Sequence, residues 1–324
     1  FLIKTNLGNV FHTGDWKTEP AENLNEKSFL SKIKGLTNEN VLSIISDSTN
    51  SLVNGKTPSE KVAYNGILKI VKKRKGCVLI TCFSSNISRI KSIITIAEKL
   101  EKKVLIIGRS LKRSVDAAIE TGILPNNLNF LSFQEIKNKS LKNILIICAG
   151  SQGESNSALS KISLDKHEKI TLEKGDTVIF SSRKIPGNEI AISKIEDRLI
   201  EKGIEVLNDE DHDVHVSGHP SREEIIEMYT LLKPLSVIPV HGNRKQLEGN
   251  ASIAETCQIS NTLIPRNGDV IKITPQGPLK LNQIKTDTKV LDCGEIISIQ
   301  DERFVLRKHA LWNGILTASI VLSD

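Results

Sequence analysis

The sequence is poor in aromatic residues, which make up 4% of its 324 residues. Proteins that hold single-stranded nucleic acid by stacking place successive bases on aromatic side chains. We therefore expect any RNA or DNA contact to be made mostly to phosphates. Methionine is scarcer still, since Met228 is the only one and residue 1 is Phe. For that reason we expect the sequence to be part of a longer chain.

Long apolar runs are missing, and none approaches the ~18 residues that a membrane-spanning helix needs. The five cysteines, at 77, 82, 148, 257 and 293, form no C-x-x-C pair, and four of the five lie in or beside apolar, strand-like runs. This pattern indicates reduced, buried thiols in a cytoplasmic protein, with no disulfide or structural zinc. With 39% hydrophobic and 25% charged residues, the composition is that of a globular protein of about two domains.

The charge is mildly basic, with a formal net value of +6. This positive charge is compatible with nucleic acid binding. Because the charge is spread over the whole length of the chain, it does not by itself indicate such binding. There is no internal repeat and no low-complexity linker.

The middle of the sequence alternates between apolar runs and amphipathic segments. Thr57, Pro58 and Glu60 form a capping box that predicts a helix to Lys73, with Thr57 as the N-cap. Further strands are predicted at 77–83, 103–107, 143–149, 176–181 and 203–207, and helices at 86–100, 110–120, 157–167 and 189–202. Such alternation is typical of a parallel sheet with helices on both faces.

The flanking regions are richer in strands. Strands are predicted at 10–17, 42–50, 214–217, 236–240, 269–273, 289–291, 304–306 and 315–322, with helices at 222–232 and 245–256. The expected plan is therefore a parallel α/β domain at 58–212 inserted into a β-rich host. The host occupies 1–57 and 213–275, and 276–324 forms return strands and the start of another domain.

Polar loops with glycine follow four of the inserted strands, at 83–86, 108–110, 150–154 and 181–189. In a parallel sheet these loops meet at one edge, where helix N-termini and serine hydroxyls suit anionic ligands. Arg89, Arg109, Arg183 and Lys184 add positive charge. The alternative is that the loops are ordinary capping turns.

Four titratable residues end strands of the host, each near Gly or Ser: Asp15, Asp47, His219 and His241. Carboxylates and imidazoles at the ends of adjacent strands are ligands that zinc accepts. Only Asp15 and His241 are good ligand candidates, whereas a catalytic zinc normally has three or more protein ligands. The residues alone therefore do not define a metal site.

Eight motifs in order resemble the ribonuclease J family: His12-Thr13-Gly14-Asp15, Asp47-Ser48-Thr49-Asn50, Phe83-Ser84-Ser85-Asn86-Ile87-Ser88-Arg89-Ile90, Gly108-Arg109-Ser110, Gly150-Ser151-Gln152-Gly153-Glu154, Ile185-Pro186-Gly187-Asn188-Glu189, His215-Val216-Ser217-Gly218-His219 and Pro239-Val240-His241-Gly242. The resemblance implies a metallo-β-lactamase fold with a β-CASP insert. It also implies a zinc-dependent nuclease that cleaves RNA in the cytoplasm from the 5′ end and internally, and that forms a homodimer.

The resemblance also implies roles for individual residues. Asp15 matches a carboxylate that bridges two Zn²⁺ ions, and His241 matches a later metal ligand. Asp47 and His219 match an acid and a histidine that assist the leaving oxygen. The residues implied in binding the RNA phosphate and 5′ end are His215, Val216, Ser217, Gly218, His219, Ser84, Ser85, Asn86 and Arg89.

Three departures from the family pattern bear on activity. The family's H-x-H-x-D-H motif and a further ligand histidine are expected ahead of residue 1, so we expect the 324 residues alone to be inactive. Asn243 stands where the family usually has Glu, and Ser155 where Pro is commoner.

Two alternatives stay open: a non-catalytic RNA-binding paralogue or subunit, and a hydrolase of the same fold that acts on a small substrate.

Overall fold

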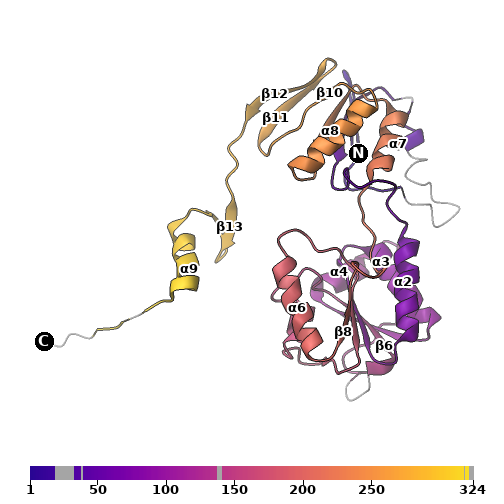
Figure 1. Ribbon diagram of the computed structural model, residues 1–324, viewed down its shortest axis with the longest axis vertical. Coiled ribbons are helices and arrows are strands. Elements are labelled where there is room, and N and C mark those ends of the chain that lie inside the picture. Colours follow the sequence, from indigo (N-terminus) through magenta and orange to yellow (C-terminus); the bar gives the residue numbers. More distant parts are fainter. Residues whose placement is uncertain (19–32, 38, 137–140, 317, 321–324) are drawn as a thin grey trace. The chain divides into compact units, whose positions relative to one another are not determined.

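The computed structural model describes residues 1–18, 33–37, 39–136, 141–316 and 318–320 (Figure 1). The chain divides into two compact units. The host unit comprises Phe1–Thr13, Glu39–Ser48 and Lys233–Asp324, and the insert unit comprises Gly14–Asn38 and Thr49–Leu232. In the described part of the chain, no helix is both long enough and apolar enough to cross a membrane.

The insert unit is built on a parallel five-stranded sheet in the order β5-β6-β4-β7-β8. Its strands are β4 (Val78–Thr81), β5 (Lys103–Ile107), β6 (Ile144–Cys148), β7 (Thr177–Phe180) and β8 (Glu205–Leu207). Alternate residues of each strand enter different cores, as Ile80 and Leu79 do on β4. Because both faces are covered, these strands are short continuous apolar runs.

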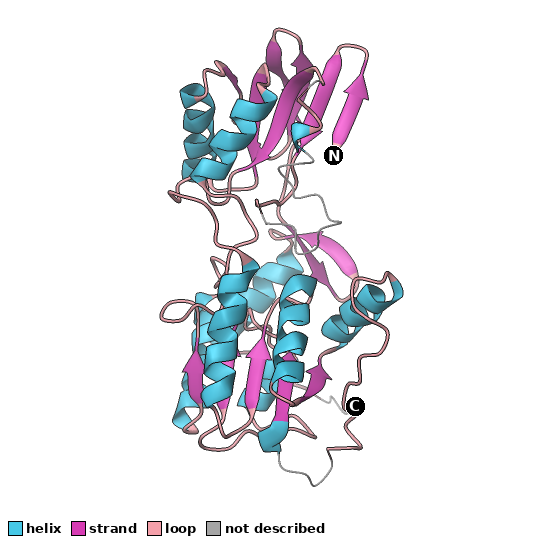
Figure 2. Cartoon of the chain, turned by 90° about the vertical axis from the view of Figure 1, so that its right-hand side faces the viewer, coloured by secondary structure: helices cyan, strands magenta, loops and turns pink. Residues whose placement is uncertain are grey.

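Helices cover both faces of this sheet (Figure 2). One core takes side chains from α2 (Glu60–Lys73), α3 (Ile87–Lys99) and α4 (Arg109–Glu120), and the other from α5 (Ala158–Ser163) and α6 (Glu189–Glu201). Helix α7 (Arg222–Leu232) ends the unit, and a 3₁₀ turn, η1 (Leu141–Asn143), precedes β6. The predicted α/β class with a parallel sheet and helices on both faces is confirmed.

The host unit has a second five-stranded sheet in the order β1-β2-β3-β9-β10. The strands are β1 (Leu2–Thr5), β2 (Gly8–His12), β3 (Val41–Asp47), β9 (Ser236–Val240) and β10 (Asn261–Thr262), and α8 (Arg244–Thr256) follows β9. All neighbours are parallel except β1 and β2. Two hairpins, β11 (Asp269–Thr274) with β12 (Gly277–Gln283) and β13 (Lys289–Asp292) with β14 (Glu295–Ser298), lead to α9 (Glu302–Asn313).

Three predicted strands were wrong. Residues 304–306 lie inside α9, because Asp301 caps that helix by accepting a hydrogen bond from the Arg303 N–H. Residues 315, 316 and 318–320 form no strand, and 317 and 321–324 lie outside the described residues. Residues 214–217 are irregular, and the Val214 carbonyl accepts hydrogen bonds from the side chains of Arg89 and Ser181.

The predicted cap of α2 and the predicted burial of the thiols also need correction. Ser59, not Thr57, caps α2 by accepting from the Lys61 N–H, while Thr57 Oγ1 donates to the His219 carbonyl. All five cysteines are free, but Cys257 is half-buried and Cys293 is exposed. The pattern predicted burial correctly for Cys77, Cys82 and Cys148, which lie in or beside sheet strands.

Candidate metal centre

Asp47 and His241 lie at the carboxyl ends of neighbouring parallel strands of the host unit. Asp47 is the last residue of β3 and pairs with Val240 at the end of β9, directly before His241. His241 Nδ1 and Asp47 Oδ1 are 3.4 Å apart. The Asp47 side chain is 1% exposed and that of His241 is 55% exposed. A buried carboxylate that orients an accessible imidazole is the arrangement used around metal-ligating histidines.

The backbone at His241 is left-handed, with φ of +56°. Such a conformation is uncommon for a residue other than glycine and is found at binding and active sites. The chain then turns directly into α8, where Asn243 accepts from the Gln246 N–H and the Gln246 side chain accepts from the Asn243 N–H. Asn243 therefore caps the helix that follows the histidine, at the position where the family pattern has an acid.

Asn250 on α8 fixes the end of β3, and the sequence interpretation missed it. Its buried amide nitrogen lies 2.9 Å from the Asp47 carbonyl, 2.9 Å from Ser48 Oγ and 3.3 Å from Ser46 Oγ. The signal was a lone polar residue on the apolar face of a helix, beside the buried Ala251, Ile253 and Ala254.

We expect Asn250→Ala to destabilise the host unit by about 2–3 kcal/mol, because buried oxygens at the end of β3 lose their donor. Denaturant unfolding measures this loss. Ser252→Ala, at an exposed position on the same helix, is the matched control and should change the free energy of unfolding by no more than about 0.5 kcal/mol. Equal stabilities of the two variants would contradict the role of Asn250.

Asp15 and His219 form a second pair, in the insert unit, with ligand atoms within 4.8 Å of each other. Hydrogen bonds hold the backbone of His219 in place. Its carbonyl accepts from Asn50 Nδ2 at 3.1 Å and from Thr57 Oγ1 at 2.7 Å, and its N–H donates to Ser217 Oγ at 3.2 Å. The same Asn50 amide donates to Ser217 Oγ at 2.8 Å. The irregular segment 214–219 is thus fixed by side chains instead of by strand pairing.

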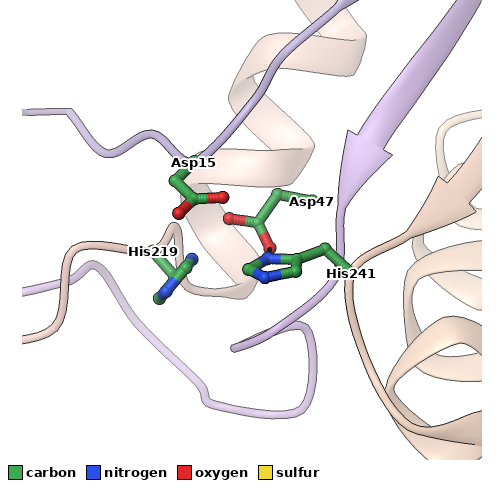
Figure 3. A group of neighbouring side chains, drawn as sticks. All are labelled: Asp15, Asp47, His219 and His241. Atoms are coloured by element: carbon green, nitrogen blue, oxygen red, sulfur yellow. Dashed lines mark hydrogen bonds and ion pairs between the residues drawn. The ribbon is translucent and has the colours of Figure 1, made fainter. Parts of the chain in front are cut away.

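The four side chains of these two pairs are drawn in Figure 3. Each pair offers one carboxylate and one imidazole, from Asp47 and His241 in the host unit and from Asp15 and His219 in the insert unit. Carboxylates and imidazoles are ligands that suit a borderline cation such as zinc.

Glu224 on α7 is a further residue that sequence reasoning missed. Its carboxylate accepts from the backbone N–H groups of Thr18, Thr57 and Ser221, at 2.7 to 2.9 Å. Burial acts to raise the pKa of Glu224, but these hydrogen bonds outweigh it and hold the pKa below its ordinary value. The carboxylate therefore stays ionised and ties the residues after His219 to the start of α2.

Arg89 does not fit its predicted contact with RNA. Its side chain is fully buried, and the guanidinium donates to Glu60 Oε2, to Ser181 Oγ and to the Val214 carbonyl. With its charge neutralised inside the unit, Arg89 positions the segment before His215. The position of Arg89 beside a Ser-rich loop suggested that it binds a ligand, whereas the apolar residues around it on α3 indicated that its side chain is buried.

The other predicted binding residues are in or next to loops of the insert unit. Asn86 caps α3 by accepting from the Arg89 N–H, Ser84 Oγ lies 3.1 Å from Ser110 Oγ, and Ser85 is exposed. In the segment 215–219, Val216 is buried and Gly218 is exposed.

His215 is held neutral. Burial, together with the cations Arg89 and Arg183, lowers its pKa to about 3. Its Nδ1 is buried and has no hydrogen-bond partner among the described residues, as suits an uncharged ring.

This pKa predicts acid sensitivity with a definite sign. The unfolded state takes up a proton near the ordinary histidine pKa of 6.5, whereas the folded state takes it up only near 3, so stability is lost as the pH falls below 6.5. Between pH 6.5 and 5.0 we expect the wild type to lose about 2 kcal/mol more free energy of unfolding than His215→Gln. His309→Gln, at an exposed position, should behave as the wild type. Parallel pH profiles for all three proteins would contradict this interpretation.

Two segments of the chain match models of known protein families. Residues 75–199 match the family described as "Ribonuclease J, beta-CASP domain", and residues 203–256 match "Zn-dependent metallo-hydrolase RNA specificity domain". A crystal structure of a protein of unknown function from Enterococcus faecalis shares the fold, with a TM-score of 0.54 at 14% identity over 86% of this chain and 60% of that one. Fold and family matches therefore define a protein of the metallo-β-lactamase type with a β-CASP insert.

Relatives named ribonuclease J match almost the whole chain. The protein from Sinorhizobium meliloti is 37% identical over 100% of this chain and 57% of its own length. Those from Synechocystis and Thermus thermophilus are 33% and 32% identical, over 99% and 100% of this chain. The chain belongs to the ribonuclease J family. It spans about half the length of these curated relatives.

Proposed function

We propose that this chain is part of a metal-dependent ribonuclease that hydrolyses RNA phosphodiesters, both from the 5′ end and internally, in the cytoplasm. The observation that carries the proposal is the pair formed by Asp47 and His241 at adjacent strand ends, in a chain of the ribonuclease J family. The homodimer remains an expectation from the same resemblance.

Asp15 and His241 are proposed as metal ligands, with Asp47 orienting His241. Hydrogen bonds and short stretches of chain support the proposal that His219 acts with them. Thr13 Oγ1 accepts from the Asp47 N–H at 3.1 Å, and Asp15 lies two residues after Thr13. Asn50, which donates to the His219 carbonyl, lies three residues after Asp47. Short stretches of chain therefore connect Asp15 to Thr13 and Asn50 to Asp47, since consecutive Cα atoms are ~3.8 Å apart.

Two bound Zn²⁺ ions would supply a water of lowered pKa and a positive charge that stabilises the phosphate. The residues of the chain would bind the RNA and assist the leaving oxygen. His219, held by Asn50 and Thr57, is placed to donate a proton or a hydrogen bond to the leaving oxygen. Ser217 and the backbone N–H groups of 215–219 are proposed to bind the scissile phosphate. The Ser84–Asn86 loop is proposed to bind the RNA 5′ phosphate.

The experiment measures zinc content and RNA hydrolysis for the 324-residue chain, alone and joined to a segment that carries an H-x-H-x-D-H motif. The 324 residues contain no such motif. We expect the chain alone to be inactive, and the joined protein to bind zinc and degrade 5′-monophosphorylated RNA. If the joined protein binds RNA without zinc and without hydrolysis, the function is that of a non-catalytic RNA-binding paralogue.

A further inference from the structure

Glu224 on α7 is the point at which three segments of the insert unit are joined. Its side chain is completely buried. Oε1 accepts hydrogen bonds from the N–H and the hydroxyl group of Thr18, and Oε2 accepts from the N–H groups of Thr57 and Ser221, at 2.8 and 2.9 Å. Because these three partners are far apart in the sequence, a single carboxylate connects three separate stretches of chain.

The helix that carries Glu224 accounts for only one of these bonds. Helix α7 begins at Arg222, and Ser221 and Glu224 have the S-x-x-E spacing of a capping box. In a capping box the acidic side chain accepts from the N–H of the capping residue, which here is the bond from Ser221. The bonds from Thr18 and Thr57 are not needed to begin the helix. They indicate that the carboxylate has a role outside α7.

The residues that Glu224 holds are close in sequence to one of the two candidate pairs. Thr18 lies three residues after Asp15, and Ser221 lies two residues after His219. The ligand atoms of Asp15 and His219 are within 4.8 Å of each other, and both side chains are drawn in Figure 3. Glu224 therefore restrains the chain next to each member of the pair, one through Oε1 and the other through Oε2.

Thr57 adds a second connection from Glu224 to His219. Its N–H donates to Glu224, and its Oγ1 donates to the His219 carbonyl at 2.7 Å. Since the Thr57 hydroxyl proton is used in that bond, Thr57 Oγ1 accepts from Ser221 Oγ, 2.9 Å away. The backbone of His219 is thus fixed through Thr57 as well as through Ser221, and both connections end on the same carboxylate.

We propose that Glu224 is a positioning residue that sets the separation of His219 from Asp15. The inference rests on the proposed function, because it takes these two side chains to act on one RNA phosphate. Their separation matters, since a displacement of ~1 Å can lower a reaction rate about 100-fold. Glu224 acts through its hydrogen-bonded neighbours and is too deeply buried to contact RNA itself.

The substitution Glu224→Gln keeps the size of the side chain and replaces one accepting oxygen by an NH₂ group, which can only donate. If the NH₂ group faced Thr57 and Ser221, it would meet two backbone N–H groups that also donate. If it faces Thr18, it meets one such N–H, and the Thr18 hydroxyl can turn and accept from it. The variant is therefore expected to keep the cap of α7 and to lose the bond from the Thr18 N–H.

The first measurement is amide hydrogen exchange in the 324-residue chain, which requires neither metal nor RNA. In Glu224→Gln we expect the Thr18 amide to exchange about tenfold faster or more, because it has lost its acceptor, while the amides of α7 keep their protection. The matched control is Glu223→Gln, the same chemical change at the neighbouring, exposed position of α7, which should leave the exchange at both places unchanged. Equal exchange at Thr18 in the wild type and in Glu224→Gln would overturn the proposal.

The second measurement is the rate of RNA hydrolysis by the chain joined to an H-x-H-x-D-H segment. We expect Glu224→Gln to lower kcat about tenfold or more, because the two side chains are displaced from each other. KM should change less than about twofold, because the residues proposed to bind RNA are retained. Circular dichroism at the assay temperature checks that the variant is fully folded, so that the loss of kcat does not come from unfolded protein.

The two measurements together separate the role of Glu224 from the proposed function. Faster exchange at Thr18 with an unchanged kcat would overturn the proposal, since Glu224 would then hold the segment without setting the separation. If the wild-type joined protein is inactive, the proposed function fails instead. The exchange measurement then decides the role of Glu224 by itself, supporting it if the Thr18 amide is released and overturning it if not.

Discussion

We expect replacement of His241 by alanine to lower the rate of RNA hydrolysis by about 100-fold or more, in a protein that joins this chain to an H-x-H-x-D-H segment. The residue is 55% exposed yet fixed by the buried Asp47 carboxylate and by a left-handed backbone. Its imidazole is thus accessible and oriented, as a metal ligand must be. Decay of 5′-monophosphorylated RNA and zinc content per chain are the two measurements, and both should fall together.

The matched control is His309→Ala, at an exposed position on α9. It removes an imidazole without touching either of the two pairs and should leave rate and zinc content unchanged. Full activity in His241→Ala would remove this histidine from the metal centre. Loss of activity with normal zinc content would assign it to substrate instead.

The second large effect concerns stability. Glu60→Leu should lower the free energy of unfolding of the insert unit by about 3–5 kcal/mol, because it leaves the Arg89 charge buried without its carboxylate. Arg89 is completely buried, and the Glu60 side chain is 11% exposed. The change also removes Glu60 from Lys17, 3.6 Å away. Chemical denaturation followed by circular dichroism gives the free energy.

Glu98→Leu, on the exposed face of α3, makes the same chemical change without a buried partner. Its expected effect is within about 0.5 kcal/mol. A loss below about 1 kcal/mol in Glu60→Leu would mean that Ser181 and the Val214 carbonyl compensate the guanidinium by themselves.

Sequence periodicity predicted the insert unit well, because its strands are buried on both faces and its helices carry one apolar side. The strand at 103–107 and the helix at 222–232 match β5 and α7 residue for residue. It failed where side chains replace regular pairing. The Val214 carbonyl is bonded by Arg89 and Ser181, and no local pattern can reveal partners so distant in sequence.

The candidate site could be predicted in part for a similar reason. Asp47 and His241 end apolar strands, so their placement at one sheet edge follows from the parallel topology. Asn250 and Glu224, in contrast, look like ordinary helical polar residues. Only the packing of α8 and α7 shows that they fix the end of β3 and the start of α2. Arg89 was misjudged because a loop motif says nothing of how deeply the following turn is buried.

The pairing of β3 with β9 has a consequence for synthesis on the ribosome. Ser43 pairs with Ser236, so one edge of β3 has no neighbour until the whole insert has been made. At ~5–20 residues per second, roughly 190 residues take about 10–40 s. During that time an apolar strand presents open hydrogen-bonding groups, the kind of edge that recruits other chains. The exposure ends when β9 has been made and pairs with β3.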